Sequence, residues 1–155
     1  MSETVWETDT RFGTAKSLRD TVEILCDRKI IHNVLDAEPL GPQKPLEALI
    51  IAPCTGNTLA KIANGITDTA VCMAAKAHLR RDRPLIIALA SNDALSANLK
   101  NIATLLSRKY VYFVPMVQDD PKNNPHSLVA DFDSLIPSFE YAMLGRRVDK
   151  IIKNG

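Results

Sequence analysis

The middle of the chain alternates between short apolar runs and segments with helical spacing. Each apolar run has the length of a buried strand, and the segments between them repeat apolar residues every third or fourth position. The predicted strands are residues 47–52, 84–90 and 110–114. The helices predicted beside them are residues 57–64, 68–80 and 93–107. Strands that alternate with helices predict an α/β fold: a three-layer, Rossmann-like (flavodoxin-like) parallel sheet with helices on both faces.

The flanking segments are less regular. Residues 15–27 have helical spacing, and a last helix is expected over about 127–144. Residues 1–13 are expected to be extended and loop-like. Residues 30–35 suit a short strand or the end of the preceding helix, and residues 36–45 hold three prolines and a glycine, which predicts a loop.

Composition narrows the class of protein. At 155 residues we expect a single domain over 1–155, and 46% hydrophobic with 24% charged residues is ordinary for a soluble globular protein. A net charge of +1 gives no field that attracts nucleic acid, and no apolar run approaches the roughly 20 residues of a membrane span. The three cysteines and three histidines show no metal-binding spacing, so we expect no metal and reduced thiols in a cytosol.

Two predicted strands end in polar turns, which is where open α/β sheets bind ligands. Residues 53–58 follow the first strand and lead into a helix, whose start offers free N–H groups and a partial positive charge. Residues 90–93 follow the second strand. If the strands are neighbours, Asn57 and Asn92 come within reach of one bound molecule. Gln118 and Asp119, after the third strand, are weaker candidates for the rim.

Each of these residues also has a purely structural interpretation. Thr55 or Asn57 before a helix is an ordinary N-cap, worth about 1 kcal/mol. Asn92 with Asp93 can cap the next helix, and Asp119 with its neighbour is typical of a turn. Cys54 has no histidine close in sequence, which favours a small buried hydrophobe over a nucleophile.

The same stretch resembles the flavin-binding decarboxylase superfamily, which includes cysteine decarboxylases and flavin prenyltransferases. The family's first motif, roughly PxSANTxxKIAxGxxD, aligns with PCTGNTLAKIANGITD at 53–68. Its second motif, PxMNxxM, falls on residues 89–95, where Asn92 matches. Segments over about residues 8–145 are similar to one branch, the B subunits of dipicolinate synthase from spore-forming bacteria.

The resemblance implies a function in making dipicolinate (pyridine-2,6-dicarboxylate) from dihydrodipicolinate during sporulation, in the mother-cell cytoplasm. It implies a partner, the A subunit, which holds NAD(P), and a homo-oligomer. FMN is the implied cofactor of the family. The binding groups for a flavin ring or a planar pyridine-like acid are then Thr55, Gly56, Asn57, Thr58, Ser91 and Asn92.

Two departures from the family pattern leave alternatives open. The cysteine decarboxylases have a histidine before the strand of the first motif, where this chain has Asp36 or a neighbour. The family also begins with a strand and a loop that hold the FMN phosphate, and the chain is expected to lack this N-terminal β-α-β unit and to bind FMN weakly or not at all alone. The alternatives are a non-catalytic partner subunit of flavoprotein fold and an FMN-dependent decarboxylase, and the catalytic residues are unknown.

Overall fold

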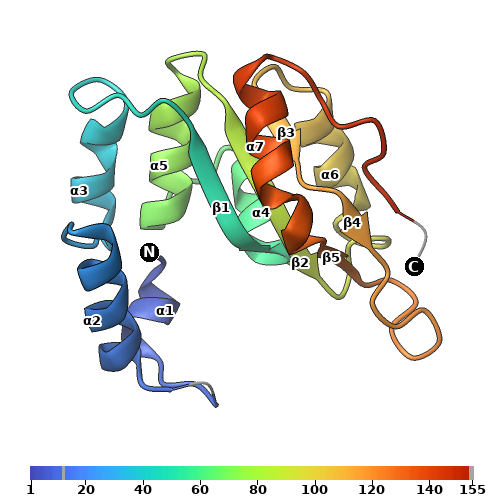
Figure 1. Cartoon of the computed structure of the whole chain (residues 1–155), viewed down its shortest axis with the longest axis horizontal. Helices are drawn as coiled ribbons and strands as arrows, with labels where there is room; N and C mark the ends of the chain where they lie inside the picture. Colours follow the sequence, from blue (N-terminus) through green and yellow to red (C-terminus); the bar gives the residue numbers. More distant parts are fainter. Residues whose placement is uncertain (12, 154–155) are drawn as a thin grey trace.

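Three parallel strands form the longer part of the sheet in the computed structural model, which describes residues 1–11 and 13–153 (Figure 1). They are β1 (Leu49–Thr55), β2 (Leu85–Ser91) and β3 (Val111–Phe113). β2 lies between the other two, with Leu85 opposite both Leu49 and Val111. The three predicted strands are therefore confirmed, with β1 running three residues further than expected.

Two short strands extend the sheet through antiparallel pairing. β5 (Leu128–Ala130) pairs antiparallel with the end of β2, and β4 (Met116–Val117) pairs antiparallel with β5. The helix predicted from residue 127 is therefore wrong at its start. Leu128 and Ala130 are buried by pairing in the sheet, and Asp131 begins a 3-10 turn, η2 (Phe132–Ser134), by accepting a hydrogen bond from the Asp133 N–H. The helix itself is α7 (Leu135–Met143).

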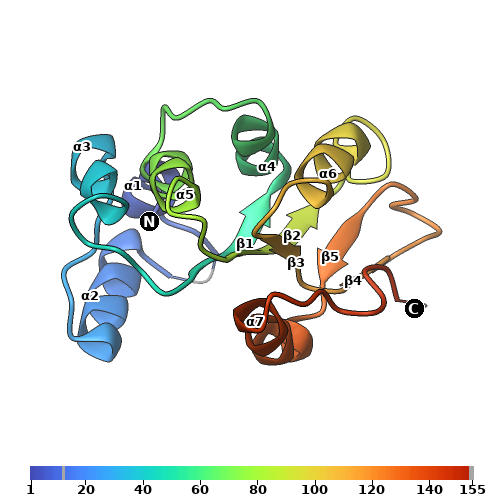
Figure 2. The ribbon, with the colours of Figure 1, turned by 90° about the horizontal axis from the view of Figure 1, so that it is seen from above.

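Helices cover both faces of the sheet, as Figure 2 shows. One face carries α4 (Gly56–Ala63), α5 (Ala70–Leu79) and α6 (Leu99–Leu106), and α7 covers the other. This confirms the three-layer α/β fold. Helix α6 begins six residues later than predicted, because the Asp93 carbonyl accepts hydrogen bonds from the N–H groups of Ser96 and Asn98 and holds residues 93–98 in turns.

The N-terminal elements lie together at one end of the molecule, beyond α5 (Figures 1 and 2). They are α1 (Glu3–Glu7), α2 (Ala15–Cys26), α3 (Val34–Ala37) and the 3-10 turn η1 (Glu38–Leu40). The extended start expected over 1–13 is wrong at α1, which Ser2 caps, and Phe12 lies outside the described residues. Residues 30–33 have no regular structure. The loop expected over 36–45 is wrong where α3 and η1 form, because the Asn33 side chain caps α3.

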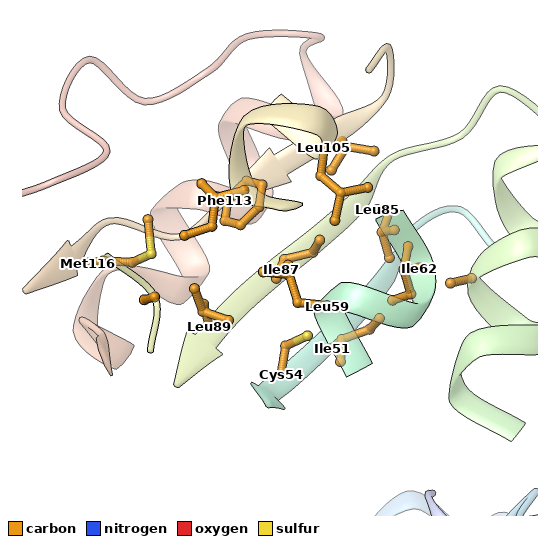
Figure 3. Close-up of a cluster of buried hydrophobic side chains, with 14 of the residues drawn as sticks. Ile51, Cys54, Leu59, Ile62, Leu85, Ile87, Leu89, Leu105, Phe113 and Met116 are labelled. Carbon is orange, nitrogen blue, oxygen red and sulfur yellow. The ribbon is translucent and has the colours of Figure 1, made fainter. Parts of the chain in front are cut away.

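The main core lies between β1, β2 and the helices of one face (Figure 3). Every residue from Leu85 to Leu89 is fully buried, as expected of a central strand with helices on both sides. Cys54 of β1 and Leu59 of α4 are fully buried in the same cluster. This packing fixes α4 against the end of β1, and α4 begins at the candidate site. No helix in the described part of the chain is long and apolar enough to span a membrane.

Candidate functional site

The first turn of α4 starts at the carboxyl end of β1. The Thr55 hydroxyl accepts a hydrogen bond from the Thr58 N–H at 3.3 Å and donates one to the Thr58 hydroxyl at 3.2 Å. Thr55 is therefore the N-cap of α4, as the structural interpretation proposed. Asn57 is not the cap, and its side chain is exposed beside the helix start.

The carboxyl ends of β1 and β2 lie side by side, because Thr55 is paired with Ala90 in the parallel register. Gly56 consequently lies against the residues that follow β2. A methyl group at Gly56 would be 2.4 Å from Ser91 Oγ and 2.7 Å from Asn98 Nδ2. The structure thus brings together the two turns that the sequence singled out, with Gly56 and Ser91 in contact and Asn57 and Asn92 exposed at adjacent strand ends.

A chain of hydrogen-bonded side chains runs from the end of β2 to the end of α4. Ser91 Oγ donates to Asp93 Oδ1 at 2.5 Å, and Asn98 Nδ2 donates to Asp93 Oδ1 and Oδ2 at 2.9 and 3.0 Å. Asn101 Nδ2 donates to Asn98 Oδ1 at 2.8 Å, and Asn64 Nδ2 donates to Asn101 Oδ1 at 3.3 Å. We call these five residues the polar network. It fixes the loop after β2 against α4.

Most of the polar network was not identified as functional from the sequence. Only Ser91 was a site candidate, and Asp93 was considered as a cap. Asn98 and Asn101 are buried, three residues apart, on the face of α6 that packs inward. Two amide side chains at helical spacing among leucine and isoleucine indicate that polar groups are buried on this face of the helix. These residues do not follow a predicted strand, so a search at strand ends does not find them.

The motif residues after Asn57 have a structural role. Lys61 and Asp68 form an ion pair with Nζ and Oδ2 2.9 Å apart, and this hydrogen bond raises the pKa of Lys61. Between them Gly65 has a φ of +73°, and the Ile66 N–H donates to the Lys61 carbonyl at 2.9 Å. The spacing of Lys, Gly and Asp therefore ends α4 and closes the following turn.

One carboxylate, that of Asp93, lies beside the start of α4. Hydrogen bonds from Ser91 and then Asn98 hold the pKa of Asp93 below its ordinary value. Burial raises the pKa of the Cys54 thiol to about 12, so Cys54 is a core residue and not a thiolate. His78 is also buried, with Nε2 2.8 Å from the Pro84 carbonyl, and burial lowers its pKa. Among the described residues no cluster of side chains suits a metal ion.

Some candidates lie away from this site. Gln118 and Asp119 follow β4, which is separated from β1 by β2 and β5 in the sheet. Gln118 Nε2 donates to the Pro125 carbonyl at 2.7 Å. Asp36 is exposed on α3, which packs on α5, and its carboxylate accepts from Asn33 Nδ2 at 2.6 Å. Neither segment is brought to the start of α4.

The chemistry of these groups suits binding. Thr58, Asn57 and Asn92 offer hydroxyl and amide groups, and the first turn of α4 offers N–H groups without partners inside the helix. Such groups complement the edge of a flavin ring, which both donates and accepts hydrogen bonds. The basic residue of α4, Lys61, is paired with Asp68 at the far end of the helix. The residues therefore fit the ring of a flavin.

Comparison with known proteins agrees with this fold and motif. The family model described as Flavoprotein matches residues 3–136, and the chain belongs to the flavoprotein family. Among its relatives is the dipicolinate synthase B subunit of Bacillus subtilis (strain 168), 41% identical over 148 residues, which are 96% of this chain and 74% of that protein.

Solved structures extend the likeness to three dimensions. The crystal structure of the dipicolinate synthase B subunit from Bacillus halodurans C matches with a TM-score of 0.88 and 39% identity over 97% of this chain and 77% of the other. The FMN-dependent cysteine decarboxylase SpaF matches with a TM-score of 0.59 and 25% identity over 84% of this chain and 73% of the other. The chain is thus a flavoprotein-family member whose relatives include both a component of dipicolinate synthase and a decarboxylase.

Proposed function

We propose that the chain is the B subunit of a dipicolinate synthase, an oxidoreductase that forms dipicolinate from dihydrodipicolinate during sporulation. The observation that carries the proposal is the similarity to a dipicolinate synthase B subunit along 96% of the chain at 41% identity. In this proposal the partner, the A subunit, holds NAD(P), and the complex works in the mother-cell cytoplasm. The present chain forms a homo-oligomer.

The proposed ligand site lies at the start of α4 and the end of β2. Thr55 caps the helix, and Gly56 allows its first turn to lie against Ser91. Asn57, Thr58 and Asn92 then present hydrogen-bonding groups to a flat heterocycle. When FMN is bound, its ring supplies redox chemistry, and these residues bind and orient the ring.

A reconstituted assay tests the assignment as a synthase component. Dipicolinate formation from dihydrodipicolinate is measured with the A subunit alone, with this chain alone, and with both. We expect efficient formation only with both proteins. Equal rates for the A subunit with and without this chain would refute the assignment.

A second candidate is a non-catalytic partner that keeps the fold and stabilises the A subunit. It is favoured by the absence of an acid–base side chain from Thr55, Asn57, Thr58, Ser91 and Asn92. The double variant Asn57→Ala/Asn92→Ala separates the candidates in the same assay. Full activity of this variant, with the complex intact by gel filtration, supports the partner role, and a large loss supports a ligand site.

The structure gives less support to an independent FMN-dependent decarboxylase. That activity needs an acid–base group at the site, and Asp36, which stands near the family's histidine in sequence, lies on α3 beside α5. Release of carbon dioxide from peptides ending in cysteine would be the decisive evidence for it.

A further inference from the structure

Three connections line the amino end of the sheet, where β1, β2 and β3 begin. They are residues 80–84 before β2, residues 107–110 before β3 and residues 144–147 after α7. The first two lie together because the Leu85 N–H donates to the Tyr110 carbonyl at 2.8 Å. The third joins them because Arg147 Nη2 donates to the Arg108 carbonyl at 3.3 Å. The three connections lie at the top of Figure 1, and the proposed ligand site lies at the opposite ends of the strands.

These connections concentrate positive charge. They hold one acidic residue, Asp82, and seven basic residues: Arg80, Arg81, Arg83, Arg108, Lys109, Arg146 and Arg147. Their net charge is therefore +6, whereas that of the whole chain is +1. All the basic residues except Arg83 are exposed. Among the ion pairs in the described part of the chain, only that of Arg83 with Glu47 includes one of them.

Stabilisation of helix ends does not account for this charge. The C-terminus of an α-helix carries roughly half a negative charge, so basic residues there are stabilising. The helices α5, α6 and α7 all end at these connections. Roughly one and a half positive charges offset three helix ends, and Glu47 offsets one more. An excess of roughly three positive charges remains on the surface.

The choice of basic residue points to a protein partner. The connections hold six of the nine arginines of the chain and one of its ten lysines. Solubility and helix capping are served equally well by lysine. Arginine is enriched and lysine depleted at protein–protein interfaces, because the planar guanidinium forms paired hydrogen bonds with a carboxylate. An arginine-rich surface of this kind complements aspartate and glutamate side chains.

A small anion does not suit this surface. The cavity between α7 and the sheet, which Tyr112, Arg146 and Arg147 help to line, has a volume of about 10 Å³. That is the space of about one water molecule. The exposed basic residues belong to three separate connections, so the positive surface is broad and has no pocket of ligand size among these residues.

We propose that the amino end of the sheet is the docking surface for an acidic face of a protein partner, which in the proposed function is the A subunit. The inference rests on the proposed partnership and adds where the partner binds and by what chemistry. Because this surface and the start of α4 lie at opposite ends of the strands, a partner docked here leaves the ligand site open.

The test removes one arginine from each connection. The glutamine variant is Arg81→Gln/Arg108→Gln/Arg146→Gln, and the lysine variant carries Lys at the same three positions. The matched control, Arg28→Gln/Lys100→Gln/Lys122→Gln, loses the same charge from exposed residues elsewhere. Circular dichroism and thermal unfolding establish that each variant is folded. Binding of each full chain to immobilised A subunit is measured by biolayer interferometry.

We expect binding to depend on charge at the amino end alone. Wild type should associate at least about ten-fold more slowly in 300 mM than in about 50 mM salt, because salt screens attraction between surface charges. At the lower salt concentration the glutamine variant should bind at least about ten-fold more weakly than wild type, and the control should change by less than about two-fold. The lysine variant should bind more tightly than the glutamine variant.

Several results would overturn the inference. One is equal binding by the folded glutamine variant and the control, which leaves the partnership itself intact. Another is equal loss in the lysine and glutamine variants, which shows that the charge is not what binds. If wild type does not bind the A subunit, the inference fails, and the reconstituted synthase assay decides the synthase assignment separately.

Two other occupants are tested with the same proteins. Sedimentation velocity compares the oligomeric state of wild type and the glutamine variant, and a smaller oligomer for the variant would assign this surface to a second copy of the chain. Fluorescence anisotropy with a labelled RNA or duplex DNA oligonucleotide tests for nucleic acid. Binding at 150 mM salt that the glutamine variant loses would assign the surface to phosphates, at about micromolar affinity or tighter. Either result overturns the inference.

Discussion

Gly56, the first residue of α4, lies against Ser91, the last residue of β2. A methyl group added at Gly56 would be 2.4 Å from Ser91 Oγ. Since real side chains do not approach so closely, Gly56→Ala must displace the Ser91 hydroxyl or the helix. We expect a loss of about 1–3 kcal/mol in the free energy of unfolding, measured by urea denaturation.

A double-mutant cycle locates the cause of that loss. Ser91→Ala removes the nearest atom, so Gly56→Ala should cost at least about 0.5 kcal/mol less in that background. Asn98 Nδ2 still lies 2.7 Å from the methyl position, so relief should be partial. As a control, Gly65→Ala meets nothing within 4 Å and is strained by its φ of +73°, so Ser91→Ala should leave its cost unchanged. Additive effects of Gly56→Ala and Ser91→Ala would contradict the clash.

The polar network makes Asn98 a second sensitive position. In Asn98→Ala, Asp93 loses two hydrogen bonds and the buried amide of Asn101 loses its acceptor. Buried polar groups left without partners cost about 1–3 kcal/mol each, so we expect a loss of about that size. Chemical denaturation measures it, and the exposed Lys100→Ala on the same helix should change stability by less than about 0.5 kcal/mol. Equal stabilities for the two variants would refute the network's contribution.

The three parallel strands could be predicted from the sequence, and the two short antiparallel-paired strands could not. The runs at 47–52 and 84–90 are long, apolar and followed by helical spacing, so local pattern and packing agree. Residues 128–130 are too few to show a period, and they become β5 only because the end of β2 is available for pairing. Short strands of this kind are set by tertiary contacts.

The candidate site shows the same division. The motif at 53–68 correctly placed a turn and a helix start beside Ser91, because adjacent parallel strands end at one edge. It did not indicate that Asp93 lies under Gly56, which depends on how residues 93–98 turn before α6. Asn92 and Asp93 are good N-cap residues, which favoured a start of α6 at residue 93 rather than at Leu99. Hydrogen bonds from Asn98 to Asp93 outweigh that preference.

The three cysteines should differ sharply toward thiol reagents. Cys26 is exposed, whereas Cys54 and Cys72 are buried, and burial raises the pKa of both, to about 12 for Cys54. Because the thiolate is the reactive form, we expect one thiol per native chain to react at pH 8 and three after denaturation in guanidinium. A chromogenic disulfide reagent counts them. Cys26→Ser should abolish the native reaction, and any rapidly reacting thiol in that variant would show that Cys54 or Cys72 is accessible.

The segment after α7 is tied to the sheet by an ion pair whose effect depends on pH. Lys153 Nζ donates to Asp131 Oδ2 at 2.5 Å, and this hydrogen bond, followed by that of Ser134, lowers the pKa of Asp131. A lowered pKa means that the stabilisation is present above the unfolded-state value of about 3.9 and is lost as pH falls through the folded value. Lys153→Met should therefore reduce stability at pH 7, and the variant should lose less than wild type on acidification below about pH 4. Thermal unfolding from pH 7 to pH 2.5 measures this, with the exposed Lys150→Met as matched control. Parallel pH profiles for wild type and Lys153→Met would show that the pair contributes nothing to acid sensitivity.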